Sequence, residues 1–269
     1  MNLDEYAVMR TAEEGPWWYR GLREVIRLHW ERHVRVAHPR LLDVGCGTGA
    51  NLAALARRSE PFGIDVAEPA IRACRERGLG ATVLASAAAL PFRAASFDVV
   101  LSCDVLGHRS LPDRRVPLAE MARVLKPGGL VLLNLPAFQW LLSSHDAAYG
   151  QDRRFTRAEA GPLLAAVGLE LVSATYWNSL LFPAAVATRL WRRRSQPAGS
   201  DLAVGSGAGA GSALMAVLRL ERALLRRLDL PFGLSVFVVG RKAQQLTTLD
   251  GGAGSPRRAG RSRADLSGP

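Results

Sequence analysis

The stretch Leu41–Leu52, with the sequence LLDVGCGTGANL, constrains the fold more than any other part of the chain. It begins as an apolar run with one acid and then places glycine at every second position, at Gly45, Gly47 and Gly49. This pattern indicates a buried strand that turns sharply into a helix, because glycine adopts positive φ at little cost and lets the backbone approach a ligand closely. The amides at the start of the helix then face the ligand, as they do in nucleotide sites.

Further apolar runs alternate with helical patterns along the chain. Strands are expected at 40–44, 62–66, 81–85, 97–102, 130–135 and 169–175, with helices at 51–58, 68–77, 116–125 and 157–167. This alternation predicts an α/β fold with a doubly wound, largely parallel sheet. A helix is also expected within residues 1–34, and SVFVVG (235–240) is expected to form the last strand.

The distribution of charge argues against an enzyme that acts on nucleic acid. The chain has 269 residues and a net charge of +11. Residues 1–188 carry 21 basic and 19 acidic side chains, whereas residues 189–230 carry 8 and 3. The part with the nucleotide-type motif is therefore nearly neutral. The three scattered cysteines match no metal or disulfide pattern, and no secretory signal is visible, so a cytoplasmic protein without a metal is expected.

The glycine motif by itself leaves two classes of cofactor open. The segment GCGTGA from Gly45 to Ala50 also matches the loop of dinucleotide-binding proteins. Asp65 follows about twenty residues later, where an acid can hold a ribose hydroxyl. An NAD-dependent oxidoreductase and another protein with a ribose-containing cofactor are both consistent with this motif.

Four segments, in order along residues 40–137, resemble the class I S-adenosylmethionine-dependent methyltransferases of type 11. They are DVGCGTG (43–49), GIDVAEPAI (63–71), ALPFRAASFDVVLSCDVLGH (89–108) and RVLKPGGLVLLNLPA (123–137). The resemblance implies a Rossmann-like seven-stranded sheet with an antiparallel last strand, S-adenosyl-L-methionine as cofactor and methyltransferase activity. Other segments, including EGPWWYRGLR (14–23), are similar to a bacterial subgroup often found with glycan or lipid biosynthesis.

The resemblance also implies which residues contact the cofactor. The glycines would pack against its amino-acid portion, Asp43 would orient their loop or meet the ammonium through water, and Asp65 would accept from the ribose hydroxyls. The acid that usually binds the adenine amino group is missing, because Ser86 and Ala87 stand at its place. The complete expected set is Asp43, Gly45, Cys46, Gly47, Thr48, Gly49, Asp65, Val66, Ser86, Ala87, Cys103 and Asp104.

Candidates for a general base lie in loops that follow two strands. An oxygen acceptor usually needs a base, whereas a carbon or amine acceptor need not. His108 follows the 97–102 strand, and the pair His145-Asp146 follows the 130–135 strand. Both positions are at the carboxyl edge of the sheet, where ligands bind. A structural loop histidine is the alternative at each position. Gln151 stands where the bacterial subgroup usually has histidine.

The expected organisation is an N-terminal helical cap (1–36), a methyltransferase domain (37–245) and a disordered tail (246–269). A helical insertion at about 178–230, with a flexible linker at 195–213, precedes the last strand. Its aromatic residues and a basic amphipathic helix at 214–230 fit either peripheral contact with the inner face of the membrane or a lid over the substrate.

The sequence thus predicts methyl transfer to a small molecule or to a lipid-linked glycan, by a monomer or homodimer that binds no nucleic acid. A non-catalytic cofactor-binding or interaction protein on the same fold is the alternative, and Ser86 and Gln151 favour it. An NAD-dependent oxidoreductase is disfavoured by the segments that follow the glycine motif.

Overall fold

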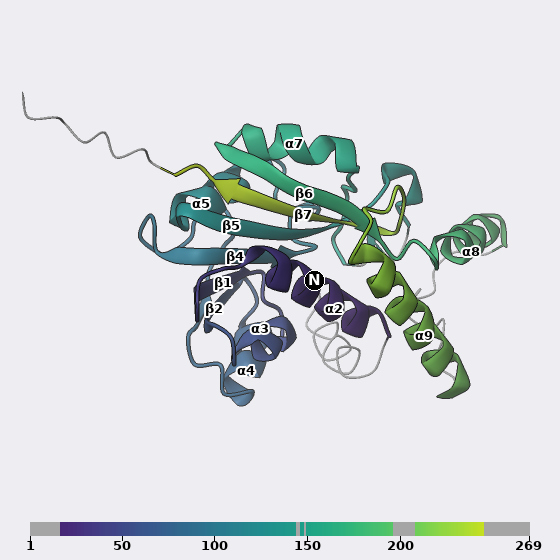
Figure 1. Cartoon of the computed structure of the whole chain (residues 1–269), viewed down its shortest axis with the longest axis horizontal. Coiled ribbons are helices and arrows are strands. Elements are labelled where there is room, and N and C mark those ends of the chain that lie inside the picture. The colour runs from purple at the N-terminus through teal and green to yellow at the C-terminus, as the bar shows by residue number, and fades with distance from the viewer. Residues whose placement is uncertain (1–16, 144–145, 148, 196–207, 245–269) are drawn as a thin grey trace, which may run out of the picture.

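Seven strands form one sheet in the order β3-β2-β1-β4-β5-β7-β6 in the computed structural model, which describes residues 17–143, 146–147, 149–195 and 208–244 (Figure 1). The strands are β1 (Arg40–Val44), β2 (Glu60–Asp65), β3 (Thr82–Leu84), β4 (Phe97–Cys103), β5 (Leu125–Pro136), β6 (Leu169–Trp177) and β7 (Ser235–Lys242). Strands β1 to β5 pair in parallel, and β7 is antiparallel to both β5 and β6. The expected Rossmann-like sheet with an antiparallel last strand is confirmed.

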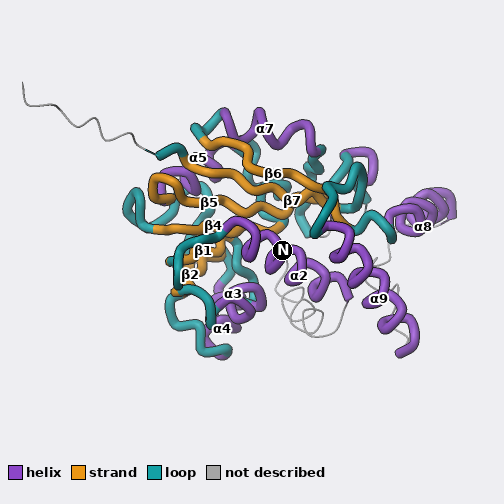
Figure 2. The backbone as a smooth tube through the Cα atoms, viewed as in Figure 1, coloured by secondary structure: helices purple, strands orange, loops and turns teal. Residues whose placement is uncertain are grey.

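Helices cover both faces of the sheet (Figure 2). They are α2 (Trp17–His33), α3 (Ala50–Leu55), α4 (Glu68–Glu76), α5 (Arg115–Val124), η1 (Gln139–Leu141), α7 (Arg157–Ala165), α8 (Phe182–Ser195) and α9 (Ala208–Leu225). One apolar core contains Leu41 and lies under α2, α3 and α4; the other contains Leu42 and lies under α5 and α7. Consecutive residues of β1 thus point to opposite faces, and both faces are buried.

The element boundaries agree best with the sequence pattern in the sheet and least well after β6. Helix α9 begins at Ala208, inside the expected linker, and ends at Leu225 rather than at residue 230. The chain leaves the helix because Leu230 joins the sheet edge: its N–H donates to Thr175 Oγ1 at 2.9 Å, and it forms a β-bridge with Tyr176. Because this N–H is bonded to Thr175, it cannot form the hydrogen bond that would extend the helix. Pro231, the next residue, has no N–H to donate to a helix.

Several expectations fall on parts of the chain that the structure does not describe. Residues 1–16 of the expected cap, most of the linker (196–207) and the tail beyond residue 244 are among these. The domain boundaries therefore stay predictions. Residues 171–188 carry no charged side chain, and the structure divides them between β6 and α8. No described helix is both long and apolar enough to cross a membrane.

Helix α2 crosses one face of the sheet and packs against α9 (Figure 1). The contact is close at Gly21, where a Cβ atom would lie 2.9 Å from Leu218 Cδ1 and 3.4 Å from Trp177 Cζ3. Glu24 of α2 also pairs with Arg222 of α9. The indole of Trp177 is fully buried at this junction, with its ring centroid 5.6 Å from that of Trp18. Helices α2 and α9 thus fix the side chain of Trp177, the last residue of β6.

Candidate functional site

The glycine loop (residues 45–49) lies between the end of β1 and α3, as the sequence predicts. Its glycines Gly45, Gly47 and Gly49 all have left-handed backbones, with φ of 76°, 54° and 84°. Side chains would also clash, because a Cβ atom at Gly45 would lie 2.3 Å from Val105 Cγ2 and one at Gly49 would lie 2.8 Å from Cys74 Sγ. The alternation of glycines is therefore required both by backbone conformation and by packing.

Asp65 ends β2 and holds the glycine loop in place. Its side chain is buried, with 7% of the residue exposed. Its Oδ2 accepts the Gly47 N–H at 2.9 Å, and its Oδ1 accepts the Ala67 N–H at 3.0 Å. The Asp65 carboxylate lies at the carboxyl end of β2 and is an acceptor group of the kind that ligand hydroxyls bind. The strand order reverses between β1 and β4, which places the glycine loop, Asp65 and the end of β4 around the crevice where such sheets bind ligands.

The remaining expected cofactor residues surround this crevice at different depths. Asp43, Cys46 and Thr48 are buried in or beneath the glycine loop. Val66 is 70% exposed directly after Asp65 and offers an apolar surface at the carboxyl edge. Ser86 and Ala87 follow β3, Cys103 ends β4, and Asp104 comes next. The Ser86 Oγ accepts the Ala88 N–H at 3.2 Å, which leaves its hydroxyl hydrogen for another partner.

The thiols of Cys46 and Cys74 belong to the packing beneath the loop. Their sulfur atoms lie 3.8 Å apart, and Cys74 Sγ donates to the Gly47 carbonyl oxygen at 3.3 Å. The hydrogen bond to Cys74 and burial both raise the pKa of Cys46. A thiol that stays protonated is a poor nucleophile, so Cys46 supports the loop through packing and is not a reactive thiol.

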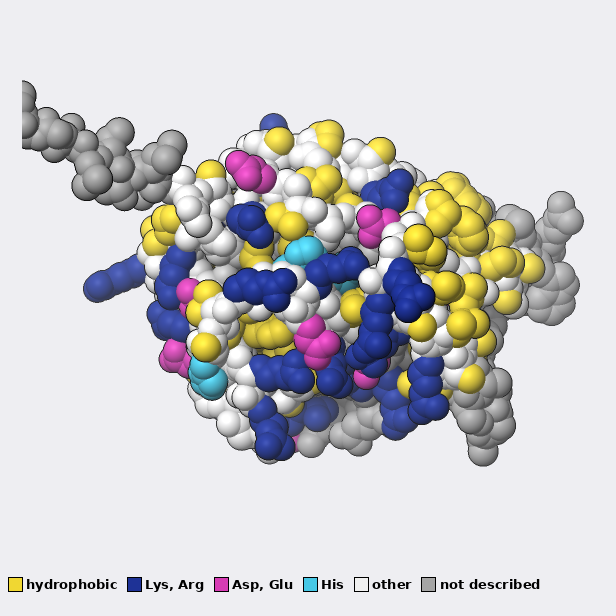
Figure 3. All heavy atoms as spheres, in the orientation of Figure 1, with side chains coloured by type: hydrophobic (Ala, Val, Ile, Leu, Met, Phe, Trp, Pro, Cys, Tyr) yellow, Lys and Arg dark blue, Asp and Glu magenta, His cyan; other side chains and the backbone are white. Residues whose placement is uncertain are grey.

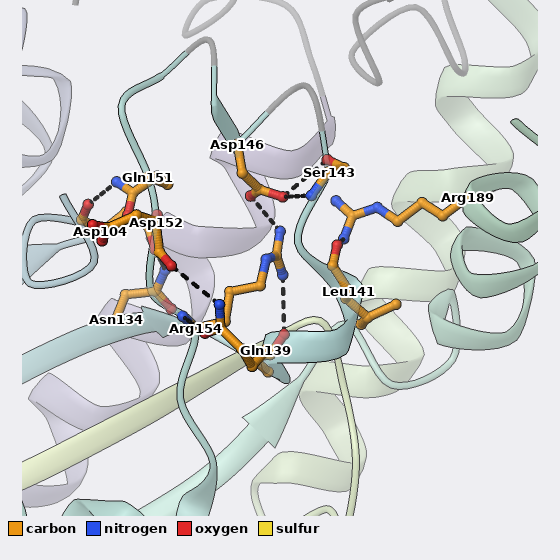
Figure 4. A network of polar contacts seen from close by, with 11 residues as sticks. Asp104, Asn134, Gln139, Leu141, Ser143, Asp146, Gln151, Asp152, Arg154 and Arg189 are labelled. Carbon is orange, nitrogen blue, oxygen red and sulfur yellow. Dashed lines mark hydrogen bonds and ion pairs between the residues drawn. The ribbon is translucent and has the colours of Figure 1, made fainter. Parts of the chain in front are cut away.

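A polar network joins the carboxyl ends of β4 and β5 (Figure 4), and a contact from Trp177 extends it to β6. Asn134 Nδ2 donates to both carboxylate oxygens of Asp104, at 3.0 and 3.1 Å. The Trp177 Nε1–H donates to Asn134 Oδ1 at 2.7 Å. Gln151 Nε2 donates to the backbone carbonyl of Asp104. Asp104 therefore lies at the centre of a network that the sequence analysis did not predict. The one sequence feature that could have indicated it is Asn134, a single polar residue inside the apolar run LVLLNLP.

Burial makes the Asp104 carboxyl an unusually weak acid. It raises the pKa of Asp104 to about 7, against the smaller lowering effects of the hydrogen bond from Asn134 and of the positive charge of Arg154. A group with such a pKa exchanges a proton readily near neutral pH, as general acids and bases do. Asp104 was expected among the cofactor contacts, and its environment also suits proton transfer.

Asp146, one of the expected catalytic residues, forms a buried ion pair with Arg154. Its other oxygen accepts hydrogen bonds from the N–H and the Oγ of Ser143, at 2.7 and 2.9 Å. Arg154 also donates to the Ala137 carbonyl at 3.0 Å. Both oxygens of Asp146 are thus engaged, and this arrangement favours a role in holding the loop after β5. Its catalytic role stays a prediction, and His145 lies outside the described residues.

His108 is half-buried in the loop after β4. Its Nδ1 lies 2.7 Å from Ser110 Oγ and accepts the Ser110 N–H at 3.2 Å. Its Nε2 faces Gly150, where a Cβ atom would lie 2.3 Å away. Burial lowers the pKa of His108 and so favours the neutral imidazole. Because Nδ1 accepts the Ser110 N–H, the neutral ring carries its proton on Nε2. The structure places His108 and Asp104 in one loop, and a catalytic role for His108 stays a prediction.

Comparison with known proteins adds to this geometry. Residues 42–133 match the family described as a methyltransferase domain. The mouse tRNA (carboxymethyluridine(34)-5-O)-methyltransferase is 32% identical over 129 residues, which is 48% of this chain and 19% of that protein. The 27-O-demethylrifamycin SV methyltransferase of Amycolatopsis mediterranei is 33% identical over 143 residues, which is 50% of each protein.

A solved structure shares the fold over most of the chain. It is the Burkholderia thailandensis 1,6-didemethyltoxoflavin-N1-methyltransferase with bound 1,6-didemethyltoxoflavin and S-adenosylhomocysteine, at a TM-score of 0.55 and 17% identity, covering 90% of this chain and 85% of that one. The chain spans half or less of the length of the two curated relatives. The strand order, the glycine loop and the family match agree with one another. Residues 42–133 are therefore similar to the methyltransferase-domain family, and the chain shares its fold with a solved methyltransferase.

Proposed function

We propose that this protein transfers the methyl group of S-adenosyl-L-methionine to a small-molecule or lipid-linked acceptor. The observation that carries the proposal is the left-handed glycine loop held by the buried carboxylate of Asp65, at the point where the strand order reverses. This is the position at which doubly wound sheets bind nucleotide-like ligands. The family match over residues 42–133 favours this cofactor over a nicotinamide dinucleotide.

The residues around the crevice fit each part of the cofactor. The glycine loop offers close backbone approach to the amino-acid portion, and we assign the ribose hydroxyls to the Asp65 carboxylate as their acceptor. The exposed Val66 offers an apolar surface to the adenine, and the Ser86 hydroxyl has a hydrogen to donate to it. When bound, the cofactor supplies an activated methyl group, while the protein supplies alignment and a dry pocket.

Charge favours a small acceptor over a tRNA, although one relative is named for a tRNA substrate. Residues 1–188 carry 21 basic and 19 acidic side chains, and so provide little excess charge for phosphate contacts. The Amycolatopsis relative is named for a small-molecule substrate. We therefore favour a small-molecule or lipid-linked acceptor.

Calorimetric titration tests the cofactor assignment. We expect S-adenosylhomocysteine to bind and NADH not to bind, because the motifs after the glycine loop distinguish the two classes. Methyl-labelled cofactor should then pass its label to a component of a small-molecule or lipid extract. Binding of NADH without S-adenosylhomocysteine would overturn the proposal. Cofactor binding without transfer to any extract fraction would favour the non-catalytic alternative.

We further infer that the acceptor is amphiphilic and is met at an anionic membrane surface. An aromatic patch is formed by Trp140 of η1, Phe182 at the start of α8 and Phe232 in the loop before β7. The ring centroids of Trp140 and Phe182 are 6.2 Å apart, and those of Phe182 and Phe232 are 5.5 Å apart. Trp140 is 50% exposed and Phe232 is 44% exposed. In Figure 3 hydrophobic side chains gather at the end of the molecule where α8 and α9 project, beside a band of basic side chains.

Helix α9 and the turn that follows it supply positive charge for such a surface. Arg219, Arg226 and Arg227 are all exposed. Basic residues beside an aromatic surface suit anionic lipid headgroups. A lid that closes over the substrate is the competing interpretation of the same segment, and it does not require the arginines.

Sedimentation with vesicles distinguishes the two interpretations. We expect the intact protein to bind phosphatidylglycerol-containing vesicles at low salt, and the Trp140→Ser/Phe232→Ser variant to bind several-fold more weakly. The control is Leu171→Ser, which removes a 45% exposed leucine from the opposite end of β6. Absence of binding by the intact protein at low salt would contradict the membrane proposal and leave the lid.

A further inference from the structure

We propose that Asp104 takes the proton from the methyl acceptor, and that Asn134 and Trp177 position its carboxylate for this task. The inference rests on the proposed function and adds to it a general base and a class of acceptor, one with a hydroxyl group. It starts from the place of Asp104 in the sheet, directly after β4 and beside the reversal of strand order.

The backbone of Asp104 is held in a strained conformation. Its φ is 58°, in the left-handed region that residues other than glycine seldom adopt. Two hydrogen bonds fix it there: its N–H donates to the Asn134 carbonyl at 2.9 Å, and its own carbonyl accepts from Gln151 Nε2. Strain of this kind persists only when the surroundings over-determine it, and it gathers at functional sites. The conformation turns the carboxylate toward Asn134 at the carboxyl edge.

The contact between Trp177 and Asn134 determines which way the Asn134 amide points. An indole N–H can only donate, so the group that faces Trp177 must be the amide oxygen. The amide nitrogen then faces Asp104 and donates to both of its oxygens. Asn134 and Trp177 are fully buried, and Trp177 is fixed by α2 and α9. The carboxylate therefore has one orientation.

The charged groups around Asp104 act on its pKa in opposite directions. From the loop after β5, Arg154 favours the ionised carboxylate and Asp146 opposes it, while these two residues pair with each other. The other neighbours named above, Asn134 on β5 and Gln151 on the same loop, are neutral amides. Burial then dominates, so the pKa of Asp104 is about 7. The carboxyl is poised between its two protonation states at physiological pH.

The other candidates for the base are engaged elsewhere. Both oxygens of Asp146 are bonded, to Arg154 and to Ser143. The imidazole of His108 has Nδ1 bonded to Ser110 and Nε2 against Gly150. Among these described groups, Asp104 alone combines a position after β4 with a pKa suited to proton exchange.

The step that follows conserves atoms and charge. The acceptor O–H bond breaks, its proton passes to a carboxylate oxygen of Asp104, the oxygen's electron pair forms the new bond to the methyl carbon, and the electrons of the broken carbon–sulfur bond stay on sulfur. Asp104 then releases the proton to solvent. A carboxylate with an ordinary pKa of about 4 would accept this proton far less readily.

Infrared difference spectroscopy on protein with labelled aspartate tests the carboxyl without any acceptor. We expect one aspartate carboxyl to titrate near pH 7, and its signal to disappear in Asp104→Asn. Asn134→Leu removes the donors that stabilise the ionised form, so the titration should move to higher pH. Trp177→Phe should move it in the same direction by less. A carboxyl that titrates near pH 4 in the wild type would overturn the proposal.

Methyl transfer to the acceptor-containing extract fraction provides the second test. At saturating S-adenosyl-L-methionine, where a change in cofactor affinity does not affect the comparison, Asp104→Asn should transfer methyl at least about 100-fold more slowly than the wild type. The wild-type rate should rise with pH up to about 7, and the variant should lose this dependence. Transfer by Asp104→Asn at the wild-type rate would refute the role of Asp104. Failure of the wild type to bind S-adenosylhomocysteine would instead refute the proposed function.

Discussion

Replacing Asp65 with alanine is expected to weaken S-adenosylhomocysteine binding at least about 100-fold. Hydrogen bonds to a charged acceptor contribute roughly 1.5–3 kcal/mol each, and the proposed function assigns both ribose hydroxyls to this carboxylate. Losing both costs about 3 kcal/mol or more, and every 1.4 kcal/mol corresponds to about tenfold in affinity. The glycine loop also loses an anchor, because Asp65 accepts the Gly47 N–H. Calorimetric titration measures the change.

A matched control separates this effect from general destabilisation. Asp98 accepts the Arg40 N–H at 2.9 Å and pairs with Lys126 at 2.8 Å, at the amino end of β4 and thus away from the crevice. Asp98→Ala should lower the melting temperature but leave S-adenosylhomocysteine affinity unchanged. Asp65→Asn keeps one acceptor oxygen, so its affinity should be intermediate. Unchanged affinity in Asp65→Ala would refute the ribose assignment.

Replacing Arg154 with methionine is expected to lower the free energy of unfolding by about 3–5 kcal/mol. Removing one partner of a buried ion pair leaves the other charge buried without compensation. Arg154 and Asp146 are each about 5% exposed, so water cannot replace the lost partner easily. Urea unfolding at pH 7 measures the difference. The double variant Arg154→Met/Asp146→Leu should recover part of the loss, because it leaves no unpaired charge.

The pH dependence of that difference follows from the acidity of Asp146. Burial would raise the pKa of Asp146, but the charge and hydrogen bond of Arg154, with help from Ser143, outweigh burial and lower it. A carboxyl with a lowered folded-state pKa contributes stability above its unfolded-state pKa of about 4, and this stability is lost as pH falls through the folded-state pKa. The gap between wild type and Arg154→Met should therefore be constant from pH 6 to 8 and narrow below about pH 4. A difference in the free energy of unfolding below about 1 kcal/mol at pH 7 would contradict this prediction, because it would show that solvent screens the Arg154–Asp146 pair.

Local sequence patterns were sufficient to predict the sheet and the glycine loop. The spacing of Gly45, Gly47 and Gly49 reflects backbone conformations that each residue adopts on its own, and Asp65 lies at a fixed distance along a strand–helix–strand unit. The end of α9 was missed because it is set by Leu230, which joins Thr175 and Tyr176 at a distant sheet edge. No local pattern contains that contact.

The polar network was missed for the same physical reason. Asn134 is 30 residues from Asp104 and 43 residues from Trp177, and only the register of the sheet brings the three together. Read in isolation, Asn134 is one polar residue in an apolar run. Its role becomes visible only when β5 is placed between β4 and β7, with Trp177 across β7 on β6.

The insertion of β7 between β5 and β6 has a consequence for synthesis on the ribosome. Every residue of the expected cofactor site precedes residue 105. The cofactor side of the crevice can therefore assemble while the chain is still growing. The Asn134–Trp177 contact spans the space that β7 fills, where Phe237 is paired with Asn134 and Ser235 with Trp177. Asn134 can meet Asp104 once β5 pairs with β4, but the Trp177 contact that orients the Asn134 amide forms across β7 and therefore only after residue 235 has been translated. A nascent chain would thus be competent to hold the methyl donor before it is competent to use it.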